Sequence, residues 1–419
     1  MLYTTIFSRI TVLTCIVAAN TCGGVSTKSL QDTLKKGSAV TDSTESSPVK
    51  TLMPGADRTE LYIDSLKGLN VGMVVNPTSI IGSKNTSIVD SLLRRGVRVK
   101  KIFGPEHGFR GNAADGAVIG NSVDKATGLP VISLYGKHYK PTPADMKGLD
   151  VMIFDIQDVG ARFYTYISTL HYVMEACAEN NVKLLVLDRP NPHGFSVDGP
   201  VLDTAFRSFV GMHPIPITHG MTIGEYAMMI NGEKWLKDGM QCALQVVKVA
   251  NYTHTSAYTL PVNPSPNLNT QQSILLYPHI CLFEGTTFSL GRGTRFPFQV
   301  IGHPLLKTKY KYSFTPVSIP GMSDNPPQKG KACYGVDLRN FDTKNIQLSG
   351  KLNLTWLLQF YNEFPDKKQF FNAYFTKLTG SNQLRKQIEA GLSEAEIRQS
   401  WEPALSEYRV MRKKYLLYP

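Results

Sequence analysis

The sequence predicts an α/β protein built on an open, mostly parallel sheet with helices on both faces. Two observations predict this fold. Short apolar runs typical of buried strands alternate with segments of helical periodicity from about residue 52 to residue 192. In addition, polar residues follow the ends of five of these strands, where such sheets form a ligand crevice. From about residue 296 onward we expect a smaller second domain of α+β type.

The stretch from residue 149 to residue 170, LDVMIFDIQDVGARFYTYISTL, is typical of the strand-to-helix junctions of this fold. Residues 151–154 are four consecutive apolar residues, as in a strand buried on both faces. Ile167, Leu170, Met174 and Cys177 then recur at helical spacing and give one apolar face. Because ligands bind beyond strand ends in α/β proteins, the polar residues between these two segments are site candidates.

The remaining elements follow the same alternation. Strands are predicted at residues 69–75, 97–103, 129–134 and 182–187. Helices are predicted at 87–95 and at 394–414. Three further helices are expected, one that begins at 143, one from the end of the central stretch to about 180, and one that ends at 231. The polar residues at or just beyond the predicted strand ends are Asn76, Glu106, His107, Tyr135, Asp155, Gln157, Asp158, Asp188, Arg189 and Asn191. Five strands that deliver polar groups to one edge favour a functional crevice. For Asp155, Asp158 and Arg162, a purely structural network of ion pairs is an equal alternative.

Composition indicates an ordinary globular protein that is exported. The chain has 419 residues, of which 42% are hydrophobic and 19% charged. Residues 1–22 contain an apolar stretch too short to span a bilayer, so we expect a signal peptide, followed by a flexible linker at 23–50. Cys22 is a candidate site for a lipid anchor, which would hold the protein in the periplasm or cell envelope. The net charge of +12 suggests an anionic partner, and no basic and aromatic pattern suggests nucleic acid.

The strongest catalytic candidate is Glu106, in the segment FGPEHGFRG. The flanking Phe103 and Phe109 can desolvate a carboxylic acid on a glycine-rich turn, and desolvation raises its pKa toward the range of a general acid. His107 and Arg110 oppose this effect. A tight turn that carries a solvated acid is the structural alternative.

Several other residues are candidates for substrate contacts. Glu225 has capping-box spacing to Thr222, so it is expected to cap a helix. His219 lies in the preceding loop, outside this capping box, and is the better candidate for a substrate contact. Tyr135, Tyr164, Asn191 and Asn267 suit sugar hydroxyl and amide groups, although such residues are often structural. Glu284 and Arg292 lie among glycines in a further loop.

Paired carboxylates are the chemistry that this set favours. Glu106 could protonate the leaving oxygen, while Asp155 or Asp158 stabilises or replaces the oxocarbenium-like centre, as the two carboxylates of a glycosidase do. His107, Asp155, Asp158, Asp188 and His219 could instead bind a metal, but no close-spaced ligand motif such as HExxH is present. The motifs GxSxG and GxxxxGK[ST] are also missing, which argues against a serine hydrolase and against nucleotide binding.

Seven segments together resemble the bacterial exo-β-N-acetylmuramidases of the NamZ type, formerly a family of unknown function. They are GPEHGFRG (104–111), TGLPVISLYG (127–136), DIQDVGARFYTYISTL (155–170), LDRPNP (187–192), HGMTIGE (219–225), PSPNL (264–268) and EGTTFSLGRGT (284–294). The resemblance extends in order from about Leu52 to the end of the sequence. It implies a Rossmann-like domain without a nucleotide or other cofactor, at residues 51–295, and a smaller auxiliary domain at 296–419.

The resemblance also implies a function. A family member removes the non-reducing terminal N-acetylmuramic acid from peptidoglycan fragments during cell-wall turnover, so muropeptides and the disaccharide MurNAc-GlcNAc are the expected partners. Glu106 resembles the central catalytic acid of the family, while His107, Asp155 and Asp158 are candidates for the second catalytic group. Arg162, Arg189 or Arg292 could hold the lactyl carboxylate of the sugar. The expected remaining substrate-binding residues are Asn76, Tyr135, Gln157, Tyr164, Asn191, His219, Asn267 and Glu284. A non-catalytic muropeptide-binding protein and a metal-dependent hydrolase remain the alternatives.

Overall fold

The computed structural model describes residues 51–110 and 120–419. The predicted signal peptide, the linker at 23–50 and the candidate anchor Cys22 lie outside the described residues. The predicted domain boundary at residues 295 and 296 stays a prediction.

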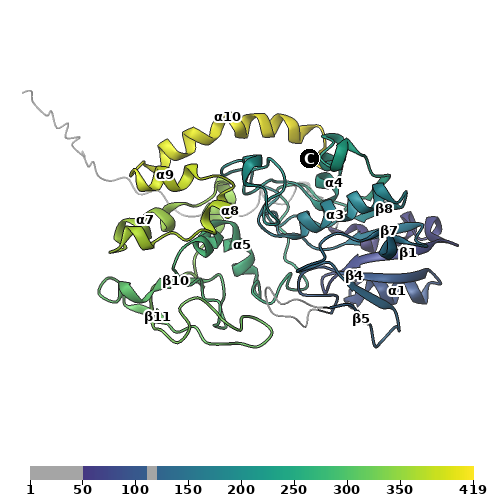
Figure 1. The fold of residues 1–419 in the computed structure, drawn as a ribbon, viewed down its shortest axis with the longest axis horizontal. Coiled ribbons are helices and arrows are strands. Elements are labelled where there is room, and N and C mark those ends of the chain that lie inside the picture. The colour runs from purple at the N-terminus through teal and green to yellow at the C-terminus, as the bar shows by residue number, and fades with distance from the viewer. Residues whose placement is uncertain (1–50, 111–119) are drawn as a thin grey trace, which may run out of the picture. The chain divides into compact units, whose positions relative to one another are not determined.

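A seven-stranded, mostly parallel sheet forms the N-terminal part of the fold (Figure 1). Its strand order is β5-β6-β4-β1-β7-β8-β9, and only the short edge strand β5 is antiparallel to its neighbour. The strands are β1 (Asn70–Val75), β4 (Arg98–Gly104), β5 (Ser122–Val123), β6 (Pro130–Ser133), β7 (Val151–Asp155), β8 (Lys183–Leu187) and β9 (Leu244–Val247), and a separate hairpin pairs β2 (Ile80–Ile81) with β3 (Thr86–Ser87). Because β6, β4, β1, β7 and β8 are parallel, their carboxyl ends share one edge, as predicted.

Successive residues of the central strands point to opposite faces, and both faces are buried. Val74 and Phe154 pack in one core with helix α3 (Tyr166–Glu179) and helix α4 (Ile223–Gly232). Met73 and Ile153 belong to a second core. That core also contains Ile88, Val89 and Leu92 of α1 (Ile88–Arg94), so helices cover both faces (Figure 1). The short helix α2 (Pro143–Met146) begins at Thr142, whose hydroxyl caps it.

The C-terminal part is smaller and is mainly helical. Its three-stranded antiparallel sheet has the order β10-β12-β11, with β10 (Val300–His303), β11 (Tyr312–Phe314) and β12 (Cys333–Asp337). Its helices are α6 (Lys344–Ser349), α7 (Thr355–Glu363), α8 (Phe375–Thr379), α9 (Gln383–Glu389) and α10 (Glu394–Lys413), and α5 (Gln271–Ile280) leads into it from the N-terminal part. Short 3-10 helices complete the fold at Gly55–Asp57, Thr59–Leu61, Asp64–Leu66, Thr204–Phe206, Lys237–Gly239, Cys281–Gly285, Pro304–Leu306 and Lys367–Gln369.

Helix α10 and the residues after it join the two parts (Figure 1). The Tyr408 hydroxyl donates to the carbonyl of His219, at 2.7 Å. Beyond the helix, the Leu417 N–H donates to the Glu225 carboxylate and the Tyr418 hydroxyl donates to Asp188 at the end of β8. Residues 415–419 therefore complete the polar contacts of the large sheet.

The predicted α/β fold class, with a mostly parallel sheet and a smaller C-terminal domain, is confirmed. The expected capping box at Thr222 is present, because the Thr222 hydroxyl accepts from the Glu225 N–H while the Glu225 carboxylate accepts from the Thr222 N–H. Strand β9 was not anticipated, since its sequence LQVV is short and only partly buried. Within residues 51–110 and 120–419, no helix has both the length and the apolar character needed to cross a membrane.

Candidate active site

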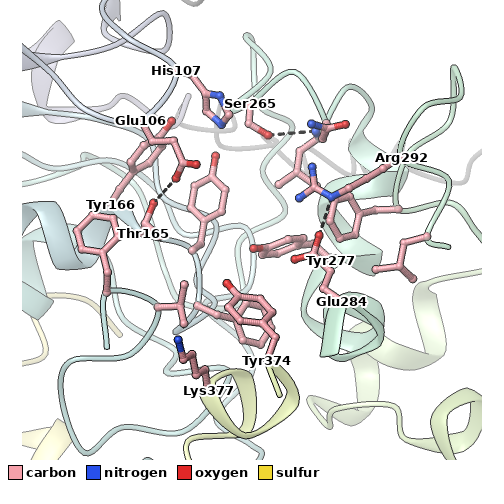
Figure 2. Close-up of a pocket in the computed structure, with 18 of the residues that line it drawn as sticks. Glu106, His107, Thr165, Tyr166, Ser265, Tyr277, Glu284, Arg292, Tyr374 and Lys377 are labelled. Atoms are coloured by element: carbon pink, nitrogen blue, oxygen red, sulfur yellow. Dashed lines mark hydrogen bonds and ion pairs between the residues drawn. The ribbon is translucent and has the colours of Figure 1, made fainter. Parts of the chain in front are cut away.

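A cavity of about 500 Å³ lies beyond the carboxyl ends of β4 and β6, between the two parts of the fold (Figure 2). One wall carries Glu106, His107, Thr165 and Tyr166, and the other carries Ser265, Glu284 and Arg292. Tyr374, which precedes α8, and Lys377 within α8 lie at one end. Ten aromatic side chains contribute to the lining, namely Tyr135, Tyr139, Phe163, Tyr164, Tyr166, Phe209, Tyr277, Phe288, Phe298 and Tyr374. A cavity with aromatic walls and a few polar groups is typical of a small-ligand site.

The turn after β4 places Glu106 in this cavity. His107 and Gly108 both have positive φ, of 70° and 74°, and the Gly108 N–H donates to the Pro105 carbonyl at 2.9 Å. A positive φ is costly for a non-glycine residue, so this conformation of His107 is an uncommon one held by the surrounding fold. Gly104 is required as well, since a Cβ there would lie 3.0 Å from the Phe109 nitrogen.

The Glu106 carboxyl is oriented by the residues that begin α3. The Thr165 hydroxyl donates to Glu106 Oε2 at 2.8 Å. Nearby, the hydroxyl groups of Tyr164 and Tyr166 donate to the Pro264 carbonyl at 2.9 and 3.2 Å. Burial raises the pKa of both tyrosines, and the charge of Glu106 raises each further, so both remain neutral donors.

The opposite wall carries a second carboxylate paired with a cation. Arg292 Nε lies 2.6 Å from Glu284 Oε1, and the Arg292 guanidinium stacks over the Phe298 ring at 4.9 Å. The thiol of Cys281 donates weakly to the other Glu284 oxygen at 3.5 Å. Lys377 on α8 adds a second cation at one end of the cavity, away from Arg292 (Figure 2). A carboxyl group and two cations thus face one aromatic chamber.

The structure brings together seven of the residues selected from the sequence. They line the cavity, and they are Glu106, His107, Tyr135, Tyr164, Asn267, Glu284 and Arg292. Eight others do not line it, and these are Asn76, Asp155, Gln157, Asp158, Arg162, Arg189, Asn191 and His219. The roles assigned to all fifteen residues stay predictions, and the contacts of the eight are described next.

Asp155 and Arg189 form a buried ion pair. Arg189 Nε and Nη2 donate to the two oxygens of Asp155 at 2.6 and 2.9 Å, and Nη2 also donates to the Ile80 carbonyl. Both side chains are almost completely buried. This bidentate pair joins the ends of β7 and β8. The structural alternative considered from the sequence named Arg162 as the cation, whereas the partner of Asp155 is Arg189.

Asp158 and His219 lie side by side beneath the cavity, with 3.8 Å between Asp158 Oδ2 and His219 Nε2. Burial raises the pKa of Asp158 to about 7 and lowers the pKa of His219 to about 3. An ion pair would shift both values in the opposite directions, but the cost of burying two charges is larger here. Between about pH 3 and pH 7 the pair is therefore neutral, with a protonated acid beside a neutral imidazole.

Arg162 is also completely buried, far from any carboxylate partner among the described residues. Its Nη1 donates to the carbonyls of Pro200 and Ile215, both at 2.7 Å, and its Nη2 donates to the carbonyl of Leu378 at 2.9 Å. Burial lowers its pKa to about 9, so the guanidinium is still charged at neutral pH. Because Leu378 belongs to α8, Arg162 fixes the helix that presents Lys377 to the cavity.

The three remaining amide side chains stabilise loops. Asn76 accepts from the N–H and hydroxyl of Thr78, and Gln157 donates to the carbonyls of Asp158 and Pro190. Asn191 donates to the Met221 carbonyl and accepts from the His193 N–H. These contacts hold the strand-end loops in place.

Sequence reasoning missed Thr165, Tyr139, Phe209, Tyr277, Tyr374 and Lys377, all of which line the cavity. Thr165 lies within the central stretch next to the selected Tyr164, so its position was a usable signal. Lys377 lies on the short helix α8 and Tyr374 directly before it, more than 200 residues from Glu106, and no local pattern marks them. No cluster of three or more His, Cys, Asp or Glu side chains that could hold a metal occurs in the part of the chain that the structure describes.

The fold and the cavity define a class of protein. A carboxylic acid held by a neighbouring hydroxyl, in an aromatic chamber with two cations, suits hydrolysis of a glycosidic bond in an acidic sugar. This class is a carbohydrate-active hydrolase on an α/β sheet.

Comparison with known proteins identifies the family. Two family models match, for the N-terminal part of exo-β-N-acetylmuramidase NamZ at residues 71–272 and for its C-terminal part at 275–418. The chain belongs to this family. A peptidoglycan β-N-acetylmuramidase NamZ of Bacillus subtilis (strain 168) is 39% identical over 385 residues, which are 88% of this chain and 90% of the relative.

Two solved structures from Bacteroides fragilis NCTC 9343, both of DUF1343 family proteins, resemble this chain. The first is 47% identical with a TM-score of 0.81, and the second is 29% identical with a TM-score of 0.73. Each match covers 88% of this chain and 99% of the other. The family predicted from the seven sequence segments is thereby confirmed, and so is its class, the glycosidases.

Proposed function

We propose that the protein is an exo-β-N-acetylmuramidase that removes N-acetylmuramic acid from the non-reducing end of peptidoglycan fragments, with Glu106 as the general acid. The relative from Bacillus subtilis is named a peptidoglycan β-N-acetylmuramidase, and the two matching family models are named for an exo-β-N-acetylmuramidase. The observation that supports the role of Glu106 is its place in the cavity, where the Thr165 hydroxyl orients its carboxyl at 2.8 Å. The smallest substrate proposed is the disaccharide MurNAc-GlcNAc.

In this mechanism the protonated Glu106 donates a proton to the glycosidic oxygen as the bond to the anomeric carbon breaks. Positive charge then develops at the anomeric carbon, as in other glycosidases. Among the described lining residues, the only other carboxylate is Glu284, and Arg292 already holds it. This pairing favours the substrate's own 2-acetamido group, or a water molecule, as the group that attacks the anomeric carbon. The anomer first released, followed by NMR, distinguishes retention from inversion.

Recognition of the lactyl carboxylate is assigned to Arg292 and Lys377. Arg292 Nε pairs with the Glu284 carboxylate, and the guanidinium group stacks on the Phe298 ring. These two contacts fix the orientation of the guanidinium group. Lys377 adds a second cation from α8. An arginine suits a planar carboxylate, and an exposed lysine adds attraction with less geometric demand.

The test is product analysis of MurNAc-GlcNAc with the wild-type protein and the Glu106→Gln variant. We expect wild-type protein to release N-acetylmuramic acid, and the variant to lose roughly 100- to 10,000-fold in kcat, since general acid catalysis contributes that much. Glu60→Gln, at an exposed glutamate outside the cavity, is the matched control and keeps full activity. Binding without turnover in the wild type would indicate a muropeptide-binding protein, and loss of activity on chelation a metal-dependent hydrolase.

We also propose that the protein is exported to the periplasm or cell envelope and anchored by a lipid at Cys22. The basis is the sequence alone, in which the apolar stretch of residues 10–19 precedes Cys22-Gly23-Gly24. Metabolic labelling with a fatty acid tests the anchor. Label is expected on the wild-type protein and lost in Cys22→Ser, and equal labelling of the two would refute the assignment.

A further inference from the structure

A second hollow of about 370 Å³ adjoins the catalytic cavity. It lies between α3 and the loops around residues 207–213 and 235–237. Ser208 and Phe209 line both spaces, so the two share a wall. The turn that carries them is fixed by two hydrogen bonds of 3.0 Å between Ser208 and Gly211. The lining residues of the second hollow are His171, Tyr172, Glu175, Arg207, Ser208, Phe209, Met212, His213, Trp235 and Lys237.

A track of aromatic rings leads from one space to the other. Tyr135 and Tyr139, in the catalytic cavity, lie 6.1 Å apart, and the Tyr139 ring lies 4.2 Å from that of Phe209. Tyr172, in the second hollow, stacks with Tyr139 at 6.3 Å and with Phe209 at 6.4 Å. All four rings are only partly buried. Partly exposed aromatic faces in a row are suited to bind the apolar faces of successive sugar rings, as amphipathic aromatics do at other wet sites.

The floor of the second hollow is rigid and neutral. His213 bonds to the Tyr226 hydroxyl at 2.8 Å and to His171 at 3.0 Å, and its ring stacks on Trp235 at 4.6 Å. Burial lowers the pKa of His171 to about 4 and holds the pKa of His213 well below its usual value, so neither histidine carries charge at neutral pH.

The charges that face the second hollow are therefore those of Arg207, Lys237 and Glu175. The Glu175 carboxylate is bound by the Lys140 ammonium at 2.6 Å and by the Lys237 N–H. Arg207 and Lys237 are both exposed, and their guanidinium and ammonium groups enter no hydrogen bond or ion pair found among the described residues. Lys140 also pairs with Glu179, at 2.7 Å. The two cations Arg207 and Lys237 stand against one lining carboxylate, so the rim is positive and suits a ligand that carries carboxylates.

We propose that the second hollow binds the sugars beyond the cleaved linkage, so that the enzyme acts faster on peptidoglycan chains than on a disaccharide. This inference rests on the proposed function. The catalytic cavity alone can hold the terminal sugar that is removed. The rest of a longer glycan chain must extend out of this cavity, and the aromatic track leads in a direction that it can follow. The next muramic acid along the chain carries its own lactyl carboxylate, for which Arg207 and Lys237 are suitable partners.

The test compares initial rates of N-acetylmuramic acid release from peptide-free MurNAc-GlcNAc and from the tetrasaccharide with two such units. The readout is the ratio of the two kcat/KM values. We expect a ratio above one in wild type and a fall of about fivefold in Tyr172→Ala, because one aromatic contact is lost. Arg207→Gln is expected to lower it similarly. The matched control is Tyr312→Ala on β11, a partly buried tyrosine that lines neither space, and its ratio stays at the wild-type value.

An equal ratio in wild type and both variants would overturn the proposal. An effect confined to a disaccharide that bears a stem peptide would overturn it as well, because the hollow would then be a peptide site. If the wild type cleaves neither sugar, the proposed function fails. Calorimetry on Glu106→Gln then measures directly whether the second hollow binds the tetrasaccharide. Tyr172→Ala in that background should weaken binding of the tetrasaccharide more than that of the disaccharide, and equal weakening would refute the inference.

Discussion

Replacement of Asp158 by asparagine tests whether its carboxyl is buried in the neutral form. Asp158 Oδ2 accepts from the Gly160 N–H at 2.7 Å, and no described residue donates to its other oxygen. Burial raises its pKa to about 7, from the value of about 3.9 that is usual for an aspartate in an unfolded chain. Between these values the folded protein holds a proton that the unfolded chain has lost, so stability falls as pH rises.

The size of the effect follows from the difference in bound protons. From pH 5 to pH 7 the folded state binds about one more proton than the unfolded state, and each pH unit costs about 1.4 kcal/mol. Above pH 7 both states have lost the proton and the penalty is constant. Asp158→Asn removes this group, and its amide oxygen can still accept from Gly160. The variant should therefore gain about 3 kcal/mol relative to wild type between pH 5 and pH 8.

Urea unfolding of both proteins at pH 5 and pH 8 measures this difference, and comparison with wild type cancels the titration of other groups. A stability difference that is the same at both pH values would refute the reasoning, because Asp158 would then be ionised already at pH 5. Turnover of MurNAc-GlcNAc by the same variant tests the catalytic role suggested by the sequence. Activity near the wild-type level is expected, since Asp158 does not line the cavity.

Two further predictions concern the supports of the site. Thr165→Val removes the hydrogen bond to Glu106, and steady-state kinetics should show kcat lower by about tenfold with KM little changed. Thr165→Ser should restore kcat, and a change in KM alone would contradict the positioning role. Arg162→Met leaves three buried carbonyls without their donor and should reduce the free energy of unfolding by at least about 3 kcal/mol. Urea unfolding measures this loss against the control Arg409→Met, at a half-buried surface arginine, and equal stability of the two variants would contradict it.

The sequence was sufficient to predict the parallel sheet and the edge at which polar residues collect. Glu106 could be selected because it follows a strand on a glycine-rich turn, where Phe103 and Phe109 can desolvate its carboxyl group. Asp155 and Arg189 could not be separated from site residues in the same way. Both lie at strand ends, and whether a strand-end side chain enters the crevice or pairs with its neighbour depends on side-chain direction across two strands.

The wall that faces Glu106 was harder to predict. Glu284 and Arg292 were noticed because a carboxylate and a guanidinium stand among glycines, but nothing local showed which wall they form. Lys377 reaches the cavity because Arg162 holds the carbonyl of Leu378 in α8. Such a contact joins residues that are 216 positions apart, and periodicity within one segment carries no information about it.

The contacts of residues 415–419 have a consequence for how the chain folds. The hydrogen bond from Tyr418 to Asp188 spans 230 residues, and the one from Leu417 to Glu225 spans 192. Contacts so distant in sequence raise the contact order and slow folding, because the closure entropy of a long loop is lost before the contact forms. The Asp188 carboxyl at the end of β8 therefore lacks one of its donors until almost the whole polypeptide has been synthesised. A ribosome-bound nascent chain that ends before residue 415 is expected to be protease-sensitive around β8 and α4, even though every strand of the large sheet has already emerged.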